Sequence, residues 1–75
     1  MKLFKISQIV NTGYDTYSDA VVTAPDMETA RNMSPSYDPD PMDEWTKPEN
    51  VTVEYLGEAA PHLGEGFICK SYHAG

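Results

Sequence analysis

A single segment, SPSYDPDPMDEWTKPE at residues 34–49, most constrains how this chain can fold. It contains four of the six prolines and five of the twelve acidic residues. Because proline fixes φ and has no backbone N–H to donate, the segment can form neither a regular helix nor an interior strand. We therefore expect a long Pro/Asp-rich loop. A loop longer than about 12–15 residues in a compact domain is usually either functional or disordered.

Alternating apolar and polar residues predict two strands before this loop. In the first ten residues, Phe4, Ile6 and Val10 share one face, and Gln8 is a polar exception on the same face. A turn that contains a glycine follows, and a second strand is predicted from Tyr17 to Ala24. We expect these two strands to pair as a hairpin.

A short helix is predicted from Pro25 to Met33. Proline suits the first helical position, because the N–H that it lacks would have no intrahelical partner there. Asp26 and Glu28 in the first turn suit the positive end of the helix dipole, and the proline after Ser34 ends the helix. The apolar stripe that we expect to face the sheet consists of Met27, Ala30 and Met33.

Two more strands are predicted after the loop. Val51, Val53 and Tyr55 alternate with polar residues in the clearest strand of the sequence, and residues 67–72 form the last strand. The predicted order is ββαββ, an antiparallel sheet with one short helix packed on one face, which is an α+β fold. A chain of 75 residues without an internal repeat makes one small domain, residues 1–75.

The chain is strongly acidic, with twelve Asp and Glu against five Lys and Arg and a net charge of −7. Such a field repels nucleic acids and anionic membranes and favours basic partners. The five basic residues are scattered along the sequence, so we expect no direct binding to nucleic acid. High charge also keeps a small protein soluble, and this simpler explanation stands beside a functional one.

The sequence predicts a cytoplasmic protein. The lone Cys69 cannot form an intramolecular disulfide. The first residues have neither the uninterrupted apolar run nor the cleavage site of a signal peptide. No run of about 18 apolar residues occurs, so we expect no membrane span.

No catalytic residue is expected. Cys69 with His62 or His73 is the one candidate pair of nucleophile and base. On a strand, however, Cys69 and His73 would lie roughly 13 Å apart, which is too far for a hydrogen bond. A cysteine in an apolar strand is more often a small core residue than a reactive thiol.

Neither a metal nor a cofactor is expected. Asp38, Asp40, Asp43 and Glu44 have the composition of a calcium-binding loop, but prolines interrupt them and no glycine supplies the sharp turn. Adventitious weak binding of Ca²⁺ or Mg²⁺ stays open. One cysteine and two histidines give no zinc-binding spacing.

The remaining candidate site is the acidic region of residues 26–49. Its seven acids minus Arg31 and Lys47 leave −5 of the total charge of −7. Prolines stiffen this backbone and lower the entropy lost on binding. The candidate partner-binding residues are Asp26, Glu28, Tyr37, Asp38, Asp40, Asp43, Glu44, Trp45 and Glu49. Trp45 has two alternative roles, since it either anchors a partner, as Trp often does at hot spots, or folds back onto the core.

Four stretches, GYDTYSDAVVTA, ETARNMSP, VTVEYLGEA and GFICKSYHAG, resemble in this order a family of small bacterial and phage-borne proteins. Members share a YDxYxxAVV strand, an EAR-type helix, a VxVEYLGEA strand and a GxIxxSxxAG end. The Pro-rich loop departs from that pattern in length and composition. The resemblance implies a single domain carried partly on mobile elements. It transfers no site residue, since no activity is assigned to the family.

Two functions follow as hypotheses. The first is a non-enzymatic interaction protein of phage or mobile-element origin, which acts in the host cytoplasm. It would bind and inhibit a basic nucleic-acid-handling protein, such as a nuclease or a CRISPR effector subunit. In this anti-CRISPR or anti-defence role, its carboxylates would mimic DNA phosphates, which lie about 3.4 Å apart along each strand. The alternative is a structural or assembly module that forms a homodimer through an edge strand.

Overall fold

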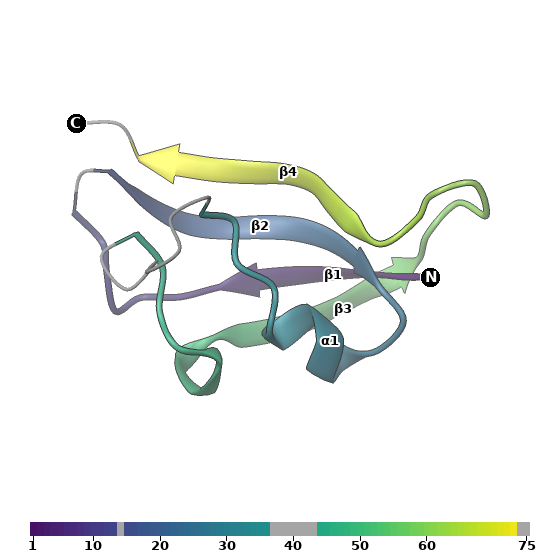
Figure 1. Ribbon diagram of the computed structural model, residues 1–75, viewed down its shortest axis with the longest axis horizontal. Helices are drawn as coiled ribbons and strands as arrows, with labels where there is room; N and C mark the ends of the chain where they lie inside the picture. Colours follow the sequence, from purple (N-terminus) through teal and green to yellow (C-terminus); the bar gives the residue numbers. More distant parts are fainter. Residues whose placement is uncertain (14, 37–43, 74–75) are drawn as a thin grey trace.

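The computed structural model describes residues 1–13, 15–36 and 44–73, and the fold within them is α+β. A four-stranded antiparallel sheet carries one short helix, as the sequence predicted (Figure 1). The elements in chain order are β1 (Lys2–Ser7), β2 (Thr16–Ala24), α1 (Met27–Arg31), the 3-10 turn η2 (Pro48–Asn50), β3 (Thr52–Glu58) and β4 (Gly66–His73). Most of the predicted Pro/Asp-rich loop, residues 37–43, lies outside the described residues.

The strands lie in the order β3-β1-β2-β4, and every pair is antiparallel. The predicted hairpin of the first two strands is present, with Lys2 opposite Ala24 and Ser7 opposite Asp19. The two hairpin strands are central, so β3 and β4 form the edges of the sheet (Figure 1).

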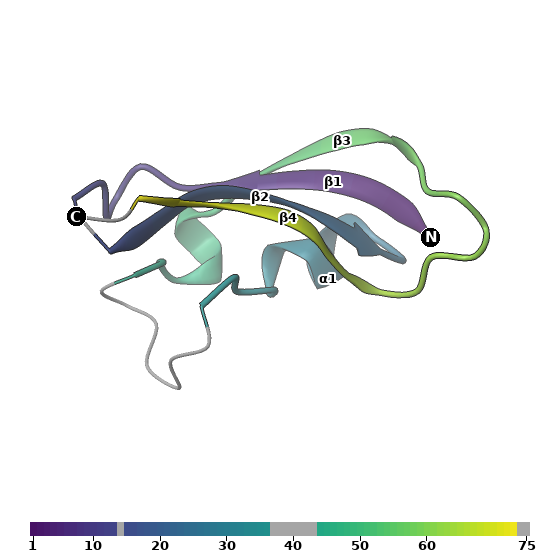
Figure 2. The ribbon, with the colours of Figure 1, turned by 90° about the horizontal axis from the view of Figure 1, so that it is seen from above.

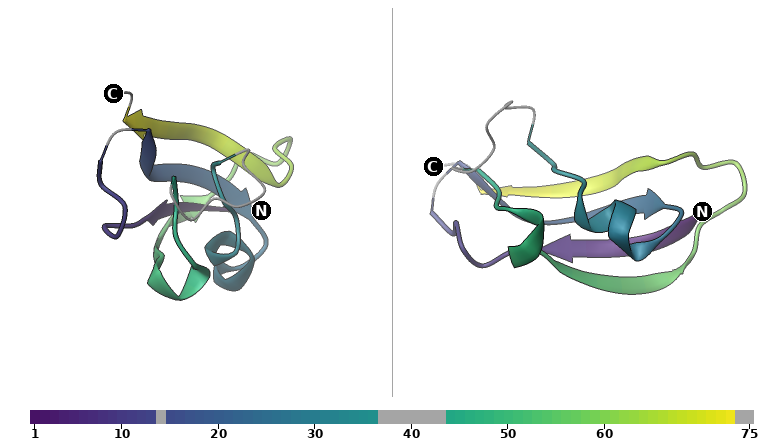
Figure 3. Two further views of the ribbon diagram at one scale, coloured as in Figure 1. Left: turned by 60° about the vertical axis from the view of Figure 1, so that its left-hand side comes forward. Right: turned by 60° about the horizontal axis from the view of Figure 1, so that its bottom comes forward.

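One face of the sheet is covered and carries the core. In Figures 2 and 3, α1 and η2 lie on the same side of the sheet. Residues directly opposite each other on antiparallel strands share a face, so Ile6 lies beside Ala20 and Val53 on the covered side. The buried apolar core consists of Phe4, Ile6, Ala20, Val22, Ala24, Ala30, Trp45 and Val51.

The pairing of β1 with β3 is interrupted near one end of the sheet. Its register shifts between Leu3 and Phe4, so that Phe4 lies opposite Tyr55 and Leu3 opposite Gly57. Gly57 has φ 146°, a backbone conformation that glycine adopts readily and that residues with a side chain rarely adopt. Tyr55 lies just before this irregularity, and its ring is 5.7 Å from the Phe4 ring, centroid to centroid, at a tilt of 58°.

The helix starts later than predicted. Pro25 was expected at the first helical position, but α1 begins at Met27, and Asp26 is its N-cap. The Asp26 carboxylate accepts a hydrogen bond from the Thr29 N–H at 2.8 Å, which satisfies one of the free donors of the first turn. Of the predicted apolar stripe, Ala30 is buried and Met33 half-buried, whereas Met27 is 46 % exposed. At the first position of a five-residue helix, Met27 lies beside the core rather than over it.

The first strand is shorter than predicted, and the side chain of Gln8 marks where it ends. β1 ends at Ser7, so Val10 does not continue the inner face and is 56 % exposed. Gln8 is buried, and its Nε2 donates to the carbonyls of Asn11 and Tyr17, each at 2.7 Å. Its Oε1 accepts from the backbone N–H of Val10 at 2.8 Å and of Asn11 at 2.7 Å. These four hydrogen bonds hold the turn between β1 and β2.

No helix in the described part of the chain is long and apolar enough to cross a membrane.

Replacing Gln8 with methionine should lower the free energy of unfolding by about 2–4 kcal/mol, because four backbone groups of the turn lose their partner. Urea unfolding, followed by the fluorescence of the single tryptophan, measures this change. Ile9→Gln at the neighbouring, almost fully exposed position is the control, and it should change stability by less than about 0.5 kcal/mol. Equal stability of the two variants would show that the network does not support the fold.

Candidate functional site

The structure describes five of the nine predicted partner-binding residues. Asp26 and Glu28 lie at the start of α1 and Glu49 in η2, and all three side chains are exposed. Glu44 and Trp45 lie where the described chain resumes after the Pro/Asp-rich loop. The other four predicted residues, Tyr37, Asp38, Asp40 and Asp43, lie outside the described residues.

Trp45 is a core residue. It is 1 % exposed and is the largest fully buried side chain of the described chain. Phe4, Ile6 and Val22 belong to the same buried cluster, and Met33 packs against that cluster. The carbonyl of Trp45 also accepts a hydrogen bond from the Asn11 Nδ2. Of the two roles that the sequence left open for Trp45, the structure therefore shows the one within the core.

The residues that flank the acidic loop are fixed to the sheet. Pro35 is fully buried, and its carbonyl accepts a hydrogen bond from the Lys70 Nζ at 2.9 Å. Ser36 donates its hydroxyl to the Glu44 carboxylate, so the two described residues that border the loop are joined directly. The Glu44 carbonyl accepts from the Tyr17 N–H at 2.9 Å. Ser36 and Glu44, which border residues 37–43, are therefore held near the start of β2.

Several basic side chains are engaged within the chain itself. Arg31 donates to the Val51 carbonyl at 2.5 Å, and Lys5 lies 3.9 Å from an Asp19 carboxylate oxygen. Lys70 binds Pro35 and also lies 4.8 Å from the centroid of the Phe67 ring. Exposed carboxylates are distributed over the helix, the loops and β3: Glu28, Glu49, Glu54, Glu58 and Glu65. The described surface therefore carries several exposed carboxylates, while three of the five basic side chains make contacts within the chain.

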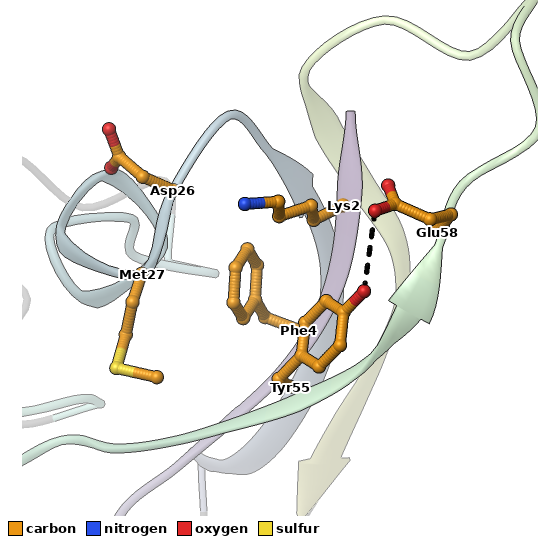
Figure 4. Close-up of a pocket in the computed structure, with 6 residues that line it drawn as sticks. All are labelled: Lys2, Phe4, Asp26, Met27, Tyr55 and Glu58. Atoms are coloured by element: carbon orange, nitrogen blue, oxygen red, sulfur yellow. Dashed lines mark hydrogen bonds between the residues drawn. The ribbon is translucent and has the colours of Figure 1, made fainter.

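A second feature, which the sequence did not predict, is an open groove of about 450 Å³ between the start of α1 and the end of β3 (Figure 4). The residues that line it are Lys2, Phe4, Asp26, Met27, Tyr55 and Glu58. The groove depends on the register shift, because the shift brings Glu58 opposite Lys2. Because nothing in the alternation of the sequence reports such a shift, pattern analysis could not have found the groove. The one available signal was Gly57 within an otherwise regular strand.

A hydrogen bond shifts the pKa of one groove residue, and desolvation with a neighbouring charge shifts the pKa of another. The Thr29 N–H bound to the Asp26 carboxylate holds the pKa of Asp26 below its usual value, so this side chain is an anion at neutral pH. The Tyr55 hydroxyl donates to the Glu58 carboxylate at 3.4 Å. Desolvation and the neighbouring charge of Glu58 raise the pKa of Tyr55, so the phenol stays neutral and remains a donor.

The position of Cys69 corrects the expectation of a core cysteine. Cys69 is a free, exposed thiol, and it lies opposite Val21 on the uncovered face of the sheet. His62 is exposed in the connection between β3 and β4, and no hydrogen bond joins it to Cys69. The structure does not describe the side chain of His73. Within the described residues, no group of three or more His, Cys, Asp or Glu is arranged to hold a metal ion.

No protein-family model matches the chain, and searches of curated proteins and of solved structures find no significant match.

Replacing Trp45 with alanine should cost about 3–5 kcal/mol, which is comparable to the whole stability of so small a domain. We expect the variant to lose its cooperative thermal transition in circular dichroism. Trp45→Phe keeps an aromatic ring in the core and should remain folded with a lower melting temperature.

Leu56→Ala on an exposed part of β3 is the control for the change in side-chain size, and it should leave the transition nearly unchanged. If the Trp45→Ala variant melted like the unmodified protein, Trp45 would not be a core residue and its role at an interface would be open again.

Proposed function

We propose that this protein is a non-enzymatic interaction module whose acidic surface binds a basic protein. The observation that carries the proposal is the concentration of charge on an anchored segment. Residues 26–49 hold −5 of the net charge of −7, and the loop within them is attached at both borders through Pro35, Ser36 and Glu44. An attached loop loses less conformational entropy on binding than a free one.

The negative charge of the surface supports the proposal of a basic partner. Twelve acidic residues against five basic ones leave carboxylates in excess, and Arg31, Lys5 and Lys70 contact groups of their own chain. A net negative field raises the association rate of a positively charged partner and slows the approach of nucleic acid. Binding of this kind weakens as salt rises, because the charges that act at a distance are screened.

We also propose a class of protein for the partner. We infer that it is a nucleic-acid-handling protein of a host cell, such as a nuclease or a CRISPR effector subunit, and that binding inhibits it. Such a partner has a basic surface that fits DNA phosphates, and closely spaced carboxylates offer a similar array of charge. The resemblance of the four sequence stretches to phage-borne proteins supports an anti-defence role in the host cytoplasm.

Neutralising two acids of the loop should weaken binding to a basic partner more than neutralising two acids elsewhere. The test variant is Asp38→Asn with Asp40→Asn, and the matched control is Glu54→Gln with Glu65→Gln. Both change the net charge by the same amount. Surface-based binding assays against purified nucleases and CRISPR effector subunits, at low and high salt, measure the affinities.

We expect the test variant to lose about tenfold or more in affinity and to lose part of the salt dependence. A control that loses as much would show that overall charge, and not this segment, attracts the partner. The absence of binding by the unmodified protein to every basic partner at low salt would contradict the proposed function.

A second function, a homodimer that forms through an edge strand, is favoured by β4. This edge strand contains no acidic residue and no proline, and Ile68 and Tyr72 on it are about half exposed. The other edge, β3, carries Glu54 and Glu58, which discourage pairing between two acidic copies. Pairing of β4 with its copy would extend the sheet across the two chains and cover the unpaired backbone groups of both edges.

The dimer would appear as a rise in mass with concentration. Sedimentation or light scattering from micromolar to millimolar protein should show twice the mass of one chain, and Ile68→Lys should return it to the monomer by placing like charges at the new interface. Ile9→Lys, away from both edges, is the control. A constant monomer mass over this range would rule out this second function.

A further inference from the structure

We propose that the groove between α1 and β3 binds an arginine side chain of the basic partner. This inference rests on the proposed function and makes it specific, because it assigns a defined contact where overall charge gives only attraction. The groove has both apolar and charged walls, and the three elements that build it meet at one end of the sheet (Figure 4).

Each element contributes one apolar and one charged side chain. In Figure 4, Met27 and Asp26 come from the start of α1, and Tyr55 and Glu58 come from β3. Phe4 and Lys2 of β1 lie between these two walls. The apolar groups and the charged groups lie toward opposite ends of the hollow, so the groove is amphipathic along its length.

The apolar end fits an aliphatic stem. Phe4 is almost completely buried and forms the base of the groove. Met27 and Tyr55, on the opposite walls, are each about half exposed although both are large apolar side chains. A stem of methylene groups inserted between them would remove this surface from water, which is favourable at about 25 cal/mol for each Å² buried.

The charged end fits a cation. Two carboxylates, Asp26 and Glu58, face one ammonium, Lys2, which leaves the groove with a net charge of −1. Neither carboxylate lies within 4.0 Å of the Lys2 Nζ, since no ion pair joins these three described residues. Each carboxylate therefore keeps oxygen atoms that can accept hydrogen bonds from an incoming donor.

Among ligands of this shape, arginine satisfies both ends best. Its guanidinium group is planar, stacks on an aromatic face such as the half-exposed Tyr55 ring, and donates two parallel hydrogen bonds to a carboxylate. An anion would meet two like charges, and a purely apolar group would desolvate the carboxylates without giving them a partner. These costs disfavour anions and purely apolar groups as occupants.

Lys2 sets the strength of this site. Its ammonium group lies in the same groove as the two carboxylates and acts on Asp26 electrostatically. A guest cation must tolerate this charge, so removing it should strengthen binding while removing a carboxylate should weaken it. A purely structural role of these residues would not produce effects of opposite sign.

The probe is N-acetyl-argininamide, titrated into the intact protein at low salt and followed by backbone amide shifts in nuclear magnetic resonance. We expect saturable shifts at the six lining residues and their neighbours, with a dissociation constant on the order of 1 mM for so small a ligand. N-acetyl-citrullinamide, which has nearly the same shape without the charge, should bind at least about tenfold more weakly. Equal binding of the two probes would overturn the proposal.

The variants test the direction of each effect. Glu58→Gln should weaken argininamide binding about fivefold, and Asp26→Asn should do the same while keeping an N-cap residue that suits the helix. Lys2→Gln should strengthen it about twofold or more. Glu54→Gln, on the same strand but on the other face of the sheet, is the matched control and should change nothing. No change with Glu58→Gln would also overturn the proposal.

The failure of this inference can be told apart from the failure of the proposed function. The double variant Asp38→Asn and Asp40→Asn should leave argininamide binding in the groove unchanged, and Glu58→Gln should weaken the binding of a whole basic partner. If the loop variant weakens partner binding and the groove variant does not, the proposed function stands and the groove has no part in it. If neither variant matters to the partner, both proposals are wrong.

Discussion

The burial of Trp45 beneath the sheet is the interaction on which the rest of this structure depends. The described residues form one sheet with one buried core cluster, and the helix has only five residues. Of that helix only Ala30 is buried, which is too little to cover the inner face of four strands. The tryptophan supplies the missing apolar surface from a position that directly follows the most polar part of the chain.

A chain of hydrogen bonds ties this tryptophan to the first turn. Gln8 binds the backbone of Asn11 through both ends of its amide, and Asn11 in turn donates its side-chain amide to the carbonyl of Trp45. The turn between β1 and β2 and the end of the acidic loop are therefore one unit. In such a unit each polar group depends on the others, because leaving one unsatisfied in a low-dielectric interior is costly.

The sequence was informative wherever a local pattern decided the structure. Strict alternation predicted β3, and the hairpin of β1 and β2 followed from apolar positions and a turn. Prediction was wrong where the outcome depended on tertiary contacts. Val10 was assigned to the inner face because the strand was expected to continue past Gln8. The side-chain amide of Gln8 instead makes four hydrogen bonds to the backbone of the turn, and β1 ends at Ser7. Cys69 was expected in the core because its strand is apolar, but β4 is an edge with one face uncovered.

The candidate site shows the same division. The composition located the acidic region, but two roles for Trp45 were compatible with it. The packing of Trp45 in the core distinguishes between these roles. The groove could not be predicted from the sequence. Its walls come from three separate segments, residues 2–4, 26–27 and 55–58, and a register shift brings Glu58 opposite Lys2.

The borders of the acidic loop and the groove lie at opposite ends of the sheet, so the two regions can affect binding in different ways. The borders of the acidic loop are attached near Tyr17, which pairs with Tyr72 at one end. The groove lies at the other end, where Lys2 pairs with Ala24 and Glu58. Charges at the periphery of an interface act mainly on the rate of association, whereas a desolvated anchor acts mainly on the rate of dissociation. On the proposed mode of binding, the loop attracts a basic partner and the groove retains it, so a partner must match both the sign of the charge and the position of one arginine.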